Sequence, residues 1–342
     1  MIYVGVDLHL RFCSMTVLDA SGAVLRQVRV PNDSASLQAF FKSCRPVGSE
    51  EKIQAAVEAC GFWPAFLDIV EPLVDKVVLV HPAKVKAIAS AKLKNDRVDS
   101  AVLAHLLRAD YLPEAWKADV ATRDLREVLR MRVSLGQDRT RYKNQVHSTL
   151  HQHGLRVPVS DLFGKDGRAW LATVALRPSA RQAIETSLRM IELLDREVQT
   201  LERQLRQAAK DDADVRCLMT IPGVGAFTAM VLKAEIGDIH RFPDKRSLYN
   251  YAGLIPVVRD SAERKYRGSI TRAGSPILRW VMTEAAITAC RCSLSAQSWY
   301  QRLAEKKHPH VARTALARKL LGAVWALWTR GVCFDERIFA AM

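Results

Sequence analysis

The 342-residue sequence contains no uninterrupted apolar stretch of about 20 residues, the length that a transmembrane helix needs. Its N-terminus is apolar, but Asp7, His9 and Arg11 interrupt it, so it lacks the pattern of a signal peptide. The seven cysteines are scattered and include no C-x-x-C pair of the kind that zinc sites use. We therefore expect reduced thiols in a cytoplasmic protein with no membrane association.

Acidic residues are in deficit. Lys and Arg total 51 against 36 Asp and Glu, which gives a formal net charge of +15. Such a surplus favours a polyanionic partner, and hence association with the nucleoid, but does not determine a fold. The sequence also has no G-x-x-x-x-G-K-[ST] loop, which argues against ATP-driven chemistry. The length predicts two or three domains.

The first 90 or so residues alternate between β-type and helical patterns. An antiparallel meander of three strands comes first, and strand–helix units follow, which predicts a mixed sheet covered by helices, the ribonuclease H-like pattern. We predict strands at residues 2–8, 12–18, 24–30, 53–58 and 76–82, and helices at 34–44, 63–73 and 83–92.

A basic helix is predicted at residues 123–153. It is either a solvated helix with snorkelling arginines or a helix that follows a phosphate backbone. The arginines concerned are Arg123, Arg126, Arg130, Arg132 and Arg139. From Ile184 to Leu205, apolar residues recur in alternating steps of three and four, which predicts a coiled coil, either within one chain or between chains.

The composition changes after residue 211. Residues 219–238 have the pattern of a helix-hairpin-helix, in which Gly223 and Gly225 would let backbone amides approach a phosphate. The alternative is a simple turn between packed helices. A loop-rich basic segment follows and contributes Arg259, Arg264, Lys265, Arg267 and Arg272 as candidate nucleic-acid contacts. The tail from about 276 is predicted to be helical. The fold class is thus α/β plus all-α.

Four carboxylates stand out because three of them lie where a strand meets a turn or helix. They are Asp7, Glu58, Asp96 and Asp99. An acid in an apolar strand is costly unless it is paired or binds a cation, and converging carboxylates suit Mg²⁺. A structural turn at Asp7 and a capping box at Asp96 and Asp99 are the alternatives. An ATPase of the actin type is disfavoured, because His9 and Arg11 stand where its Asp-x-Gly-x-Thr pattern would have the Gly and the hydroxyl residue after Asp7.

Several motifs together resemble the IS110-family transposases, also called bridge-RNA-guided recombinases. The resemblance covers nearly the whole chain and keeps motif order and spacing. The motifs are Gly5-Val-Asp7, Val57-Glu58-Ala, Asp96-Arg-Val-Asp99, Ile221-Pro-Gly-Val-Gly225, Ala252-Gly-Leu-Ile-Pro256, Arg267-Gly268, Arg272-Ala-Gly274 and Leu278-Arg279.

The resemblance implies a RuvC-like domain joined through a coiled coil to a C-terminal transposase domain. We place these at residues 1–160, 161–210 and 211–342. It implies that the four carboxylates bind Mg²⁺ and that Ser261 is the catalytic serine, eight residues after Gly253. It also implies a noncoding RNA that pairs with target and donor DNA. The protein would act as a dimer or tetramer, with the carboxylate site of one subunit completed by the serine domain of another.

The serine position departs from the family pattern, because Ala262 follows it where Gly is frequent. Ser269 is therefore a second candidate nucleophile. Two other functions stay open at this point. A RuvC-like nuclease that activates water would need the carboxylates but not Ser261, and a nucleic-acid-binding scaffold would need neither.

Overall fold

The computed structural model describes residues 1–45, 50–88, 95–261 and 264–337, and in the ranges 258–261 and 264–267 it describes the backbone alone. The chain divides into two units, Met1–Lys117 and Ala118–Met342. The helix predicted at 83–92 is described only as far as Ile88. The three domains placed at residues 1–160, 161–210 and 211–342 were assigned by their expected functions, and those boundaries stay a prediction.

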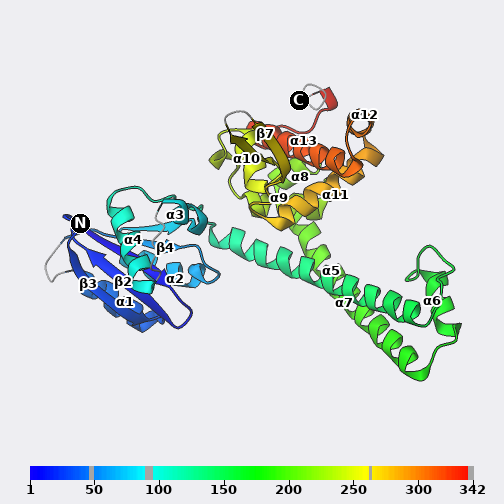
Figure 1. Ribbon diagram of the computed structural model, residues 1–342, viewed down its shortest axis with the longest axis horizontal. Coiled ribbons are helices and arrows are strands. Elements are labelled where there is room, and N and C mark those ends of the chain that lie inside the picture. Colours follow the sequence, from blue (N-terminus) through cyan, green and yellow to red (C-terminus); the bar gives the residue numbers. More distant parts are fainter. Residues whose placement is uncertain (46–49, 89–94, 262–263, 338–342) are drawn as a thin grey trace. The chain divides into compact units, whose positions relative to one another are not determined.

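The first unit is built on a five-stranded sheet in the order β3-β2-β1-β4-β5 (Figure 1). Strands β1 to β3 are antiparallel neighbours, whereas β4 is parallel to both β1 and β5, so the predicted meander and mixed sheet are confirmed. The strands are β1 (Ile2–Leu8), β2 (Phe12–Leu18), β3 (Val24–Pro31), β4 (Ile53–Glu58) and β5 (Lys76–Val80). The helices are α1 (Ser34–Cys44), α2 (Trp63–Val70), α3 (Pro82–Ile88) and α4 (Asp96–Arg108), with a 3₁₀ turn, η1, at Glu71–Leu73.

Helices cover both faces of this sheet, because its strands together place apolar residues on both faces. Val4 and Val6 pack with Phe41 of α1 and Phe66 of α2 in one core cluster. On the other face, Ala56 of β4 packs in a second cluster with residues of α3 and α4. Asp7 is in phase with Gly5 and therefore lies on the α4 face, at the carboxyl end of the strand.

The contact between α4 and β1 is unusually close. A Cβ atom on Gly5 would lie 2.0 Å from the carbonyl oxygen of Ser100 and 2.5 Å from the amide nitrogen of Ala104, so only glycine fits beneath the helix. Beside this contact, the buried hydroxyls of Thr16 and Ser100 are 2.9 Å apart. Gln27 donates to both the Thr16 hydroxyl and the Arg97 carbonyl. These bonds hold the first turn of α4 over the end of β1.

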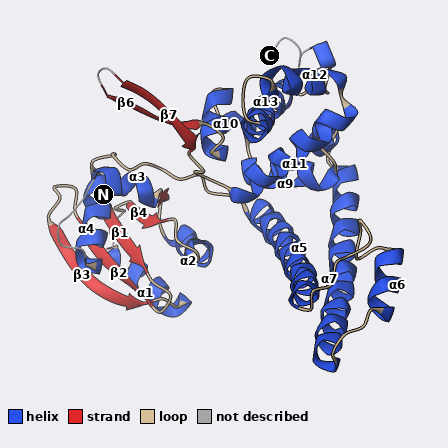
Figure 2. Cartoon of the chain, turned by 45° about the vertical axis from the view of Figure 1, so that its right-hand side comes forward, coloured by secondary structure: helices blue, strands red, loops and turns tan. Residues whose placement is uncertain are grey.

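In the second unit, α5 (Val120–Gln152) packs antiparallel against α7 (Pro178–Asp211), and the two appear side by side in Figure 2. Arg132 pairs with Glu202 and Arg139 with Asp195, so the two contacts lie seven residues apart on each helix. The apolar positions of α7 that the sequence analysis identified, from Ile184 to Leu205, are buried or half-buried. The helical character of both segments is confirmed, and α7 finds a partner within its own chain.

The remaining helices of this unit, except α6, form a largely apolar core around α9, α11 and α13, whereas α6 packs in a separate cluster with α5 and α7. The elements are α6 (Lys165–Thr173), α8 (Ala213–Leu218), α9 (Ala226–Ile236), η2 (Ile239–Arg241), α10 (Lys245–Ala252), α11 (Pro276–Cys292), α12 (Leu294–Ala304) and α13 (Pro309–Arg330). The segment that the sequence analysis took as loop-rich contains α10 and an antiparallel hairpin, β6 (Pro256–Ser261) and β7 (Arg264–Ile270) (Figure 2). Its many charges concealed the strands, because charged residues are depleted in strands.

We predict that Gly5→Ala destabilises the first unit. The added methyl group would collide with backbone atoms of α4, which must move away from the sheet, at a cost of about 2–3 kcal/mol in the free energy of unfolding. Urea unfolding of the full chain, followed by circular dichroism, measures the loss. Gly61→Ala is the matched control, because a Cβ there meets nothing within 4 Å. Equal stability of the two variants would contradict the close approach.

Candidate functional site

Asp7 and Glu58 end neighbouring parallel strands. The register of β1 and β4 pairs Val6 with Val57, so the next residues along the two strands are Asp7 and Glu58. Both continue the face that holds Gly5 and Ala56, beneath α4. The topology thus brings together two carboxylates that are 51 positions apart in the sequence.

Asp96 and Asp99 lie in the first turn of α4, and Asn95 precedes them as the cap. The Asn95 side chain accepts a hydrogen bond of 2.8 Å from the amide of Val98. Because Asn95 fills the cap position, Asp96 is the first residue of the helix rather than its cap, which corrects the capping-box alternative. Carboxylates in a first turn are favoured by the helix dipole, and both remain available to a ligand.

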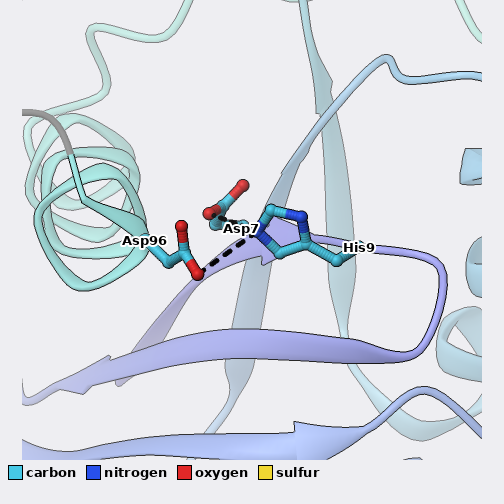
Figure 3. Close-up of side chains that lie close together, drawn as sticks. All are labelled: Asp7, His9 and Asp96. Atoms are coloured by element: carbon cyan, nitrogen blue, oxygen red, sulfur yellow. Dashed lines mark hydrogen bonds and ion pairs between the residues drawn. The ribbon is translucent and has the colours of Figure 1, made fainter.

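His9 joins Asp7 and Asp96 in a compact group (Figure 3). Its Nε2 atom lies 3.1 Å from Oδ2 of Asp7 and 3.5 Å from Oδ2 of Asp96. One ligand atom from each residue falls within 4.8 Å of the others, the spacing of a metal site. Among the described residues, neither Glu58 nor Asp99 belongs to this group.

The turn between β1 and β2 fixes the backbone of His9. Its amide donates to the Phe12 carbonyl at 2.9 Å, and its own carbonyl accepts from the Asn32 side chain at 2.9 Å. The sequence analysis treated His9 only as an interruption of an apolar run. The sequence did contain a signal for this contact, because a histidine two residues after an aspartate at the end of a strand can fold back beside that aspartate in a tight turn.

The electrostatics of the group favour a cation. Burial raises the pKa of Asp7 above its ordinary value, His9 lowers it in part, and the charges of Asp96 and Asp99 raise it again. A carboxylate that is partly desolvated and repelled by two others gains most when a positive ion binds beside it. Carboxylate and imidazole donors fit a divalent metal ion, and the donor set alone does not select one.

The hairpin β6–β7 carries the candidate serines. Ser261 is the last residue of β6 and pairs in register with Arg264, while Lys265 and Arg267 follow on β7. Arg259 pairs with Tyr266, and Ala262 lies outside the described residues. Ser269, near the end of β7, is exposed.

Two glycines and an arginine hold the base of this hairpin. Gly253 and Gly274 have positive φ, and a Cβ on either would meet backbone atoms at 2.3 Å and 1.8 Å respectively. Arg279 donates from one nitrogen to the carbonyls of Ala252 and Ala273, at 3.1 Å and 2.6 Å. Arg272, at φ 55°, donates its amide to Gly253 at 3.3 Å. The motif residues around 252 and 274 therefore pack against each other.

Arginines of the basic helix α5 are engaged inside the second unit. Arg126 donates to the carbonyls of Ala234 and Glu235, in the last turn of α9, at 2.8 Å and 3.1 Å. Arg130 lies 3.6 Å from the buried carboxylate of Glu235.

Two further arginines of α5, Arg132 and Arg139, pair with acids of α7, and Arg123 lies in the first turn of α5. A role of these five in nucleic-acid binding stays a prediction, and their visible partners are protein groups.

The turn before α9 places Gly223 and Gly225 differently. Gly223 has φ 82°, and a Cβ there would lie 2.1 Å from the carbonyl oxygen of Ala285 in α11, so this glycine serves helix packing. Gly225 is exposed, caps α9 and has open space where a Cβ would stand. A phosphate contact at either glycine stays a prediction.

Among the helices that the structure describes, none is both long and apolar enough to cross a membrane.

Comparison with known proteins gives one family model for each half of the chain. The model DEDD_Tnp_IS110, described as a transposase, matches residues 4–154. The model described as "Transposase IS116/IS110/IS902 family" matches residues 215–301.

Individual relatives match over most of their length. The chain is 28% identical to the transposase for insertion sequence element IS1111A of Coxiella burnetii, over 80% of this chain and 77% of that protein. It is 27% identical to a probable family 20 transposase of Pseudomonas aeruginosa, over 88% and 89%. It is 24% identical to the transposase for IS1328 of Yersinia enterocolitica, over 97% and 98%.

We predict opposite effects of Asp7→Asn with and without metal. In EDTA at pH 7.5 the variant should have the higher melting temperature, because the raised pKa means that the fold opposes the charge of Asp7. That cost is fully present above the folded-state pKa and disappears towards the ordinary Asp pKa of about 3.9. The advantage of the variant should therefore shrink as the pH falls.

Addition of Mn²⁺ or Mg²⁺ should reverse the order, raising the melting temperature of the wild type and not of Asp7→Asn. Stabilisation of about 2.7 kcal/mol is expected when the metal is at 100 times its dissociation constant. Asp110→Asn is the control, since Asp110 is exposed and its positive φ suits asparagine. Identical metal responses of the wild type and Asp7→Asn would exclude Asp7 as a ligand.

Proposed function

The chain belongs to the IS116/IS110/IS902 family of transposases, and from that premise we propose an RNA-guided recombinase that uses Mg²⁺ and a serine nucleophile. A transposase is an enzyme that acts on DNA, so DNA binding by this chain follows from the family. The convergence of Asp7 and Asp96 beside His9 is the observation that carries the metal-dependent part of the proposal.

Asp7, Glu58, Asp96 and Asp99 are the proposed ligands of Mg²⁺. Two of them already share a group with His9, the register of β1 and β4 brings Glu58 beside Asp7, and Asp99 is near enough to raise the pKa of Asp7. Oxygen donors are those that Mg²⁺ prefers. A bound ion would supply Lewis-acid stabilisation of a phosphate oxygen. His9 would hold the Asp7 carboxylate in place through its hydrogen bond.

Ser261 is the proposed nucleophile. Its hydroxyl would give up its proton as Oγ attacks a DNA phosphorus, forming a Ser–O–P bond while the bond to the 3′ oxygen breaks, and the leaving 3′ oxygen would take up a proton to become a hydroxyl. The phosphodiester energy is thereby kept in a phosphoserine ester, and a different 3′ hydroxyl can reverse the step without ATP. The backbone of the hairpin pairs Ser261 with Arg264, and the basic residues 259, 264, 265 and 267 would bind phosphate oxygens near it.

The finer architecture is proposed on the same premise. We infer a RuvC-like fold for the five-stranded sheet, a coiled coil for the α5–α7 pair and a helix-hairpin-helix for α8 and α9. The order of strands, the seven-residue spacing of the α5–α7 ion pairs and the exposed Gly225 support these assignments. A dimer or tetramer would bring the serine of one subunit to the carboxylates of another.

The nucleophile is tested by trapping. A nicked suicide DNA substrate should leave a protein–DNA adduct that resists SDS, and peptide mapping should place it at Ser261. Ser261→Ala should abolish the adduct, with its circular dichroism unchanged, and Ser269→Ala should retain it. Transfer of the effect to Ser269→Ala would assign the role to Ser269. Cleavage with no adduct in the wild type would support the nuclease that activates water.

The RNA partner is tested separately, because the catalytic assignments do not depend on it. Protein purified at low salt should carry a discrete RNA from its own element, and removal of this RNA should abolish site-specific recombination. Return of the purified RNA should restore it. Asp7→Asn protein should still carry the RNA, which separates binding from catalysis. Efficient recombination at specific sites by RNA-free protein would refute RNA guidance.

A further inference from the structure

A cavity of about 670 Å³ in the second unit has no role in the function proposed above. It lies among α10, α12 and α13, and α13 contacts both of the others and lies between their labels in Figure 1. Its volume is in the range of small-ligand sites. The lining includes four basic side chains and two aromatic ones, namely Lys245, Arg246, Arg318, Lys319, Tyr249 and Trp299.

The positive charge of this cavity is poorly compensated. Among the described residues, Lys245, Arg246 and Arg318 lie within 4 Å of no carboxylate, so none of the three forms an ion pair. The acid in the lining, Asp244, already accepts from the amide and the hydroxyl of Ser247 as the cap of α10. Lys245, Arg246 and Arg318 therefore line the hollow without an ion pair in the described part of the chain, and the charge of Arg246 acts on Asp244 only as one of the smaller causes that lower its pKa.

Partial burial makes the positive charge of Lys319 less favourable. It lowers the pKa of Lys319 from its ordinary value, and the charges of Arg302 and Lys245 lower it further. The Lys319 ammonium lies 5.4 Å from the centre of the Trp299 ring, against the aromatic wall. Cations held close together beside apolar walls attract an anion more strongly than the same cations in open water.

A second, smaller hollow of about 320 Å³ adjoins the first, since Ala315 and Arg318 line both. Its other walls include Pro256, where β6 begins, and Ser269, near the end of β7. The second hollow thus connects the basic cavity to the base of the β6–β7 hairpin. Two adjoining hollows that share Arg318, the first of them lined by three further basic side chains, are suited to an extended polyanion rather than to one isolated phosphate.

We propose that the cavity binds successive backbone phosphates of a single nucleic-acid strand and leads that strand towards the β6–β7 hairpin. A duplex is too wide for a hollow of this volume. The phosphodiester backbone is common to DNA and RNA, and the experiment below distinguishes them. The inference rests on the proposed function only in that the chain handles nucleic acid; it requires neither Ser261 as the nucleophile nor an RNA guide.

The test is fluorescence anisotropy of the full chain with labelled 15-nucleotide strands of dT and of rU, each titrated at several salt concentrations. Arg246→Gln with Arg318→Gln should weaken binding of at least one strand about fivefold or more at 100 mM salt. It should also flatten the log–log salt slope by about 0.7 for each phosphate that the variant no longer neutralises. Weaker binding of dT alone identifies DNA as the ligand, and weaker binding of rU alone identifies RNA.

Arg291→Gln with Arg330→Gln is the matched control, since it removes two exposed arginines of the same unit that do not line the cavity. Should Arg318→Gln disturb the fold, Lys245→Gln with Arg246→Gln tests the same claim with two exposed residues. Equal weakening in the cavity and control variants would overturn the proposal, as would unchanged binding. Displacement of the strands by equimolar inorganic phosphate would overturn it in favour of a small-anion site.

Failure of this proposal is distinguishable from failure of the proposed function. Asp110→Asn should bind both strands as the wild type does, because Asp110 lies in the other unit and outside the proposed metal site. If the variant with Arg246→Gln and Arg318→Gln binds the strands normally and still forms the Ser261 adduct, strand binding by the cavity is refuted and the proposed function is not. If the wild type forms no adduct but the cavity variants still have lower strand affinity, the role of Ser261 is refuted and strand binding by the cavity is not.

Discussion

The approach of α4 to Gly5 is the contact on which the first unit's candidate site depends. Without a side chain at Gly5, the backbone of α4 at Ser100 and Ala104 can lie directly on β1. The hydroxyls of Thr16 and Ser100, together with Gln27, then fix the helix in one register. Asp96, at the start of that helix, is brought to the carboxyl end of β1, where Asp7 and His9 are. A shift of α4 by one residue would separate the group, because successive helix residues point in different directions.

Arginine plays a different structural part in the second unit. Arg126 satisfies carbonyls in the last turn of α9 that have no partner within their helix, and Arg279 does the same for the chain segments at the base of the hairpin. The planar guanidinium suits this task, since it offers several donors in fixed directions. Part of the net charge of +15 is therefore used inside the fold. Three cations that form no ion pair in the described part of the chain, Lys245, Arg246 and Arg318, line the cavity beside α10 and α13, which is why that surface, rather than the basic helix, carries the inference of strand binding.

Much of the local structure was predictable, because it depends on periodicity and on capping. The strands of the meander, the parallel strands β4 and β5 and the long helices α5 and α7 follow from alternation of apolar residues and from steps of three and four. The hairpin was not predicted, since its strands are rich in charged residues. The close backbone approach of Gly223 to α11 was not predicted either, and its proposed phosphate contact stays a prediction.

The sequence by itself determined which residues are candidates for the chemistry: carboxylates at strand ends, an acidic first turn of a helix and a large basic surplus, all of which follow from residue type and local pattern. Tertiary structure alone decided which of them meet. His9 joins Asp7 because a turn folds it back, and Asp96 joins because glycine lets a helix that is distant in the sequence rest on the strand. The arginines of α5 acquire acids and carbonyls of α7 and α9, while those of α10 and α13 that line the cavity do not. The reason is physical: pairing depends on distances set by packing between distant segments, and no local pattern encodes those distances.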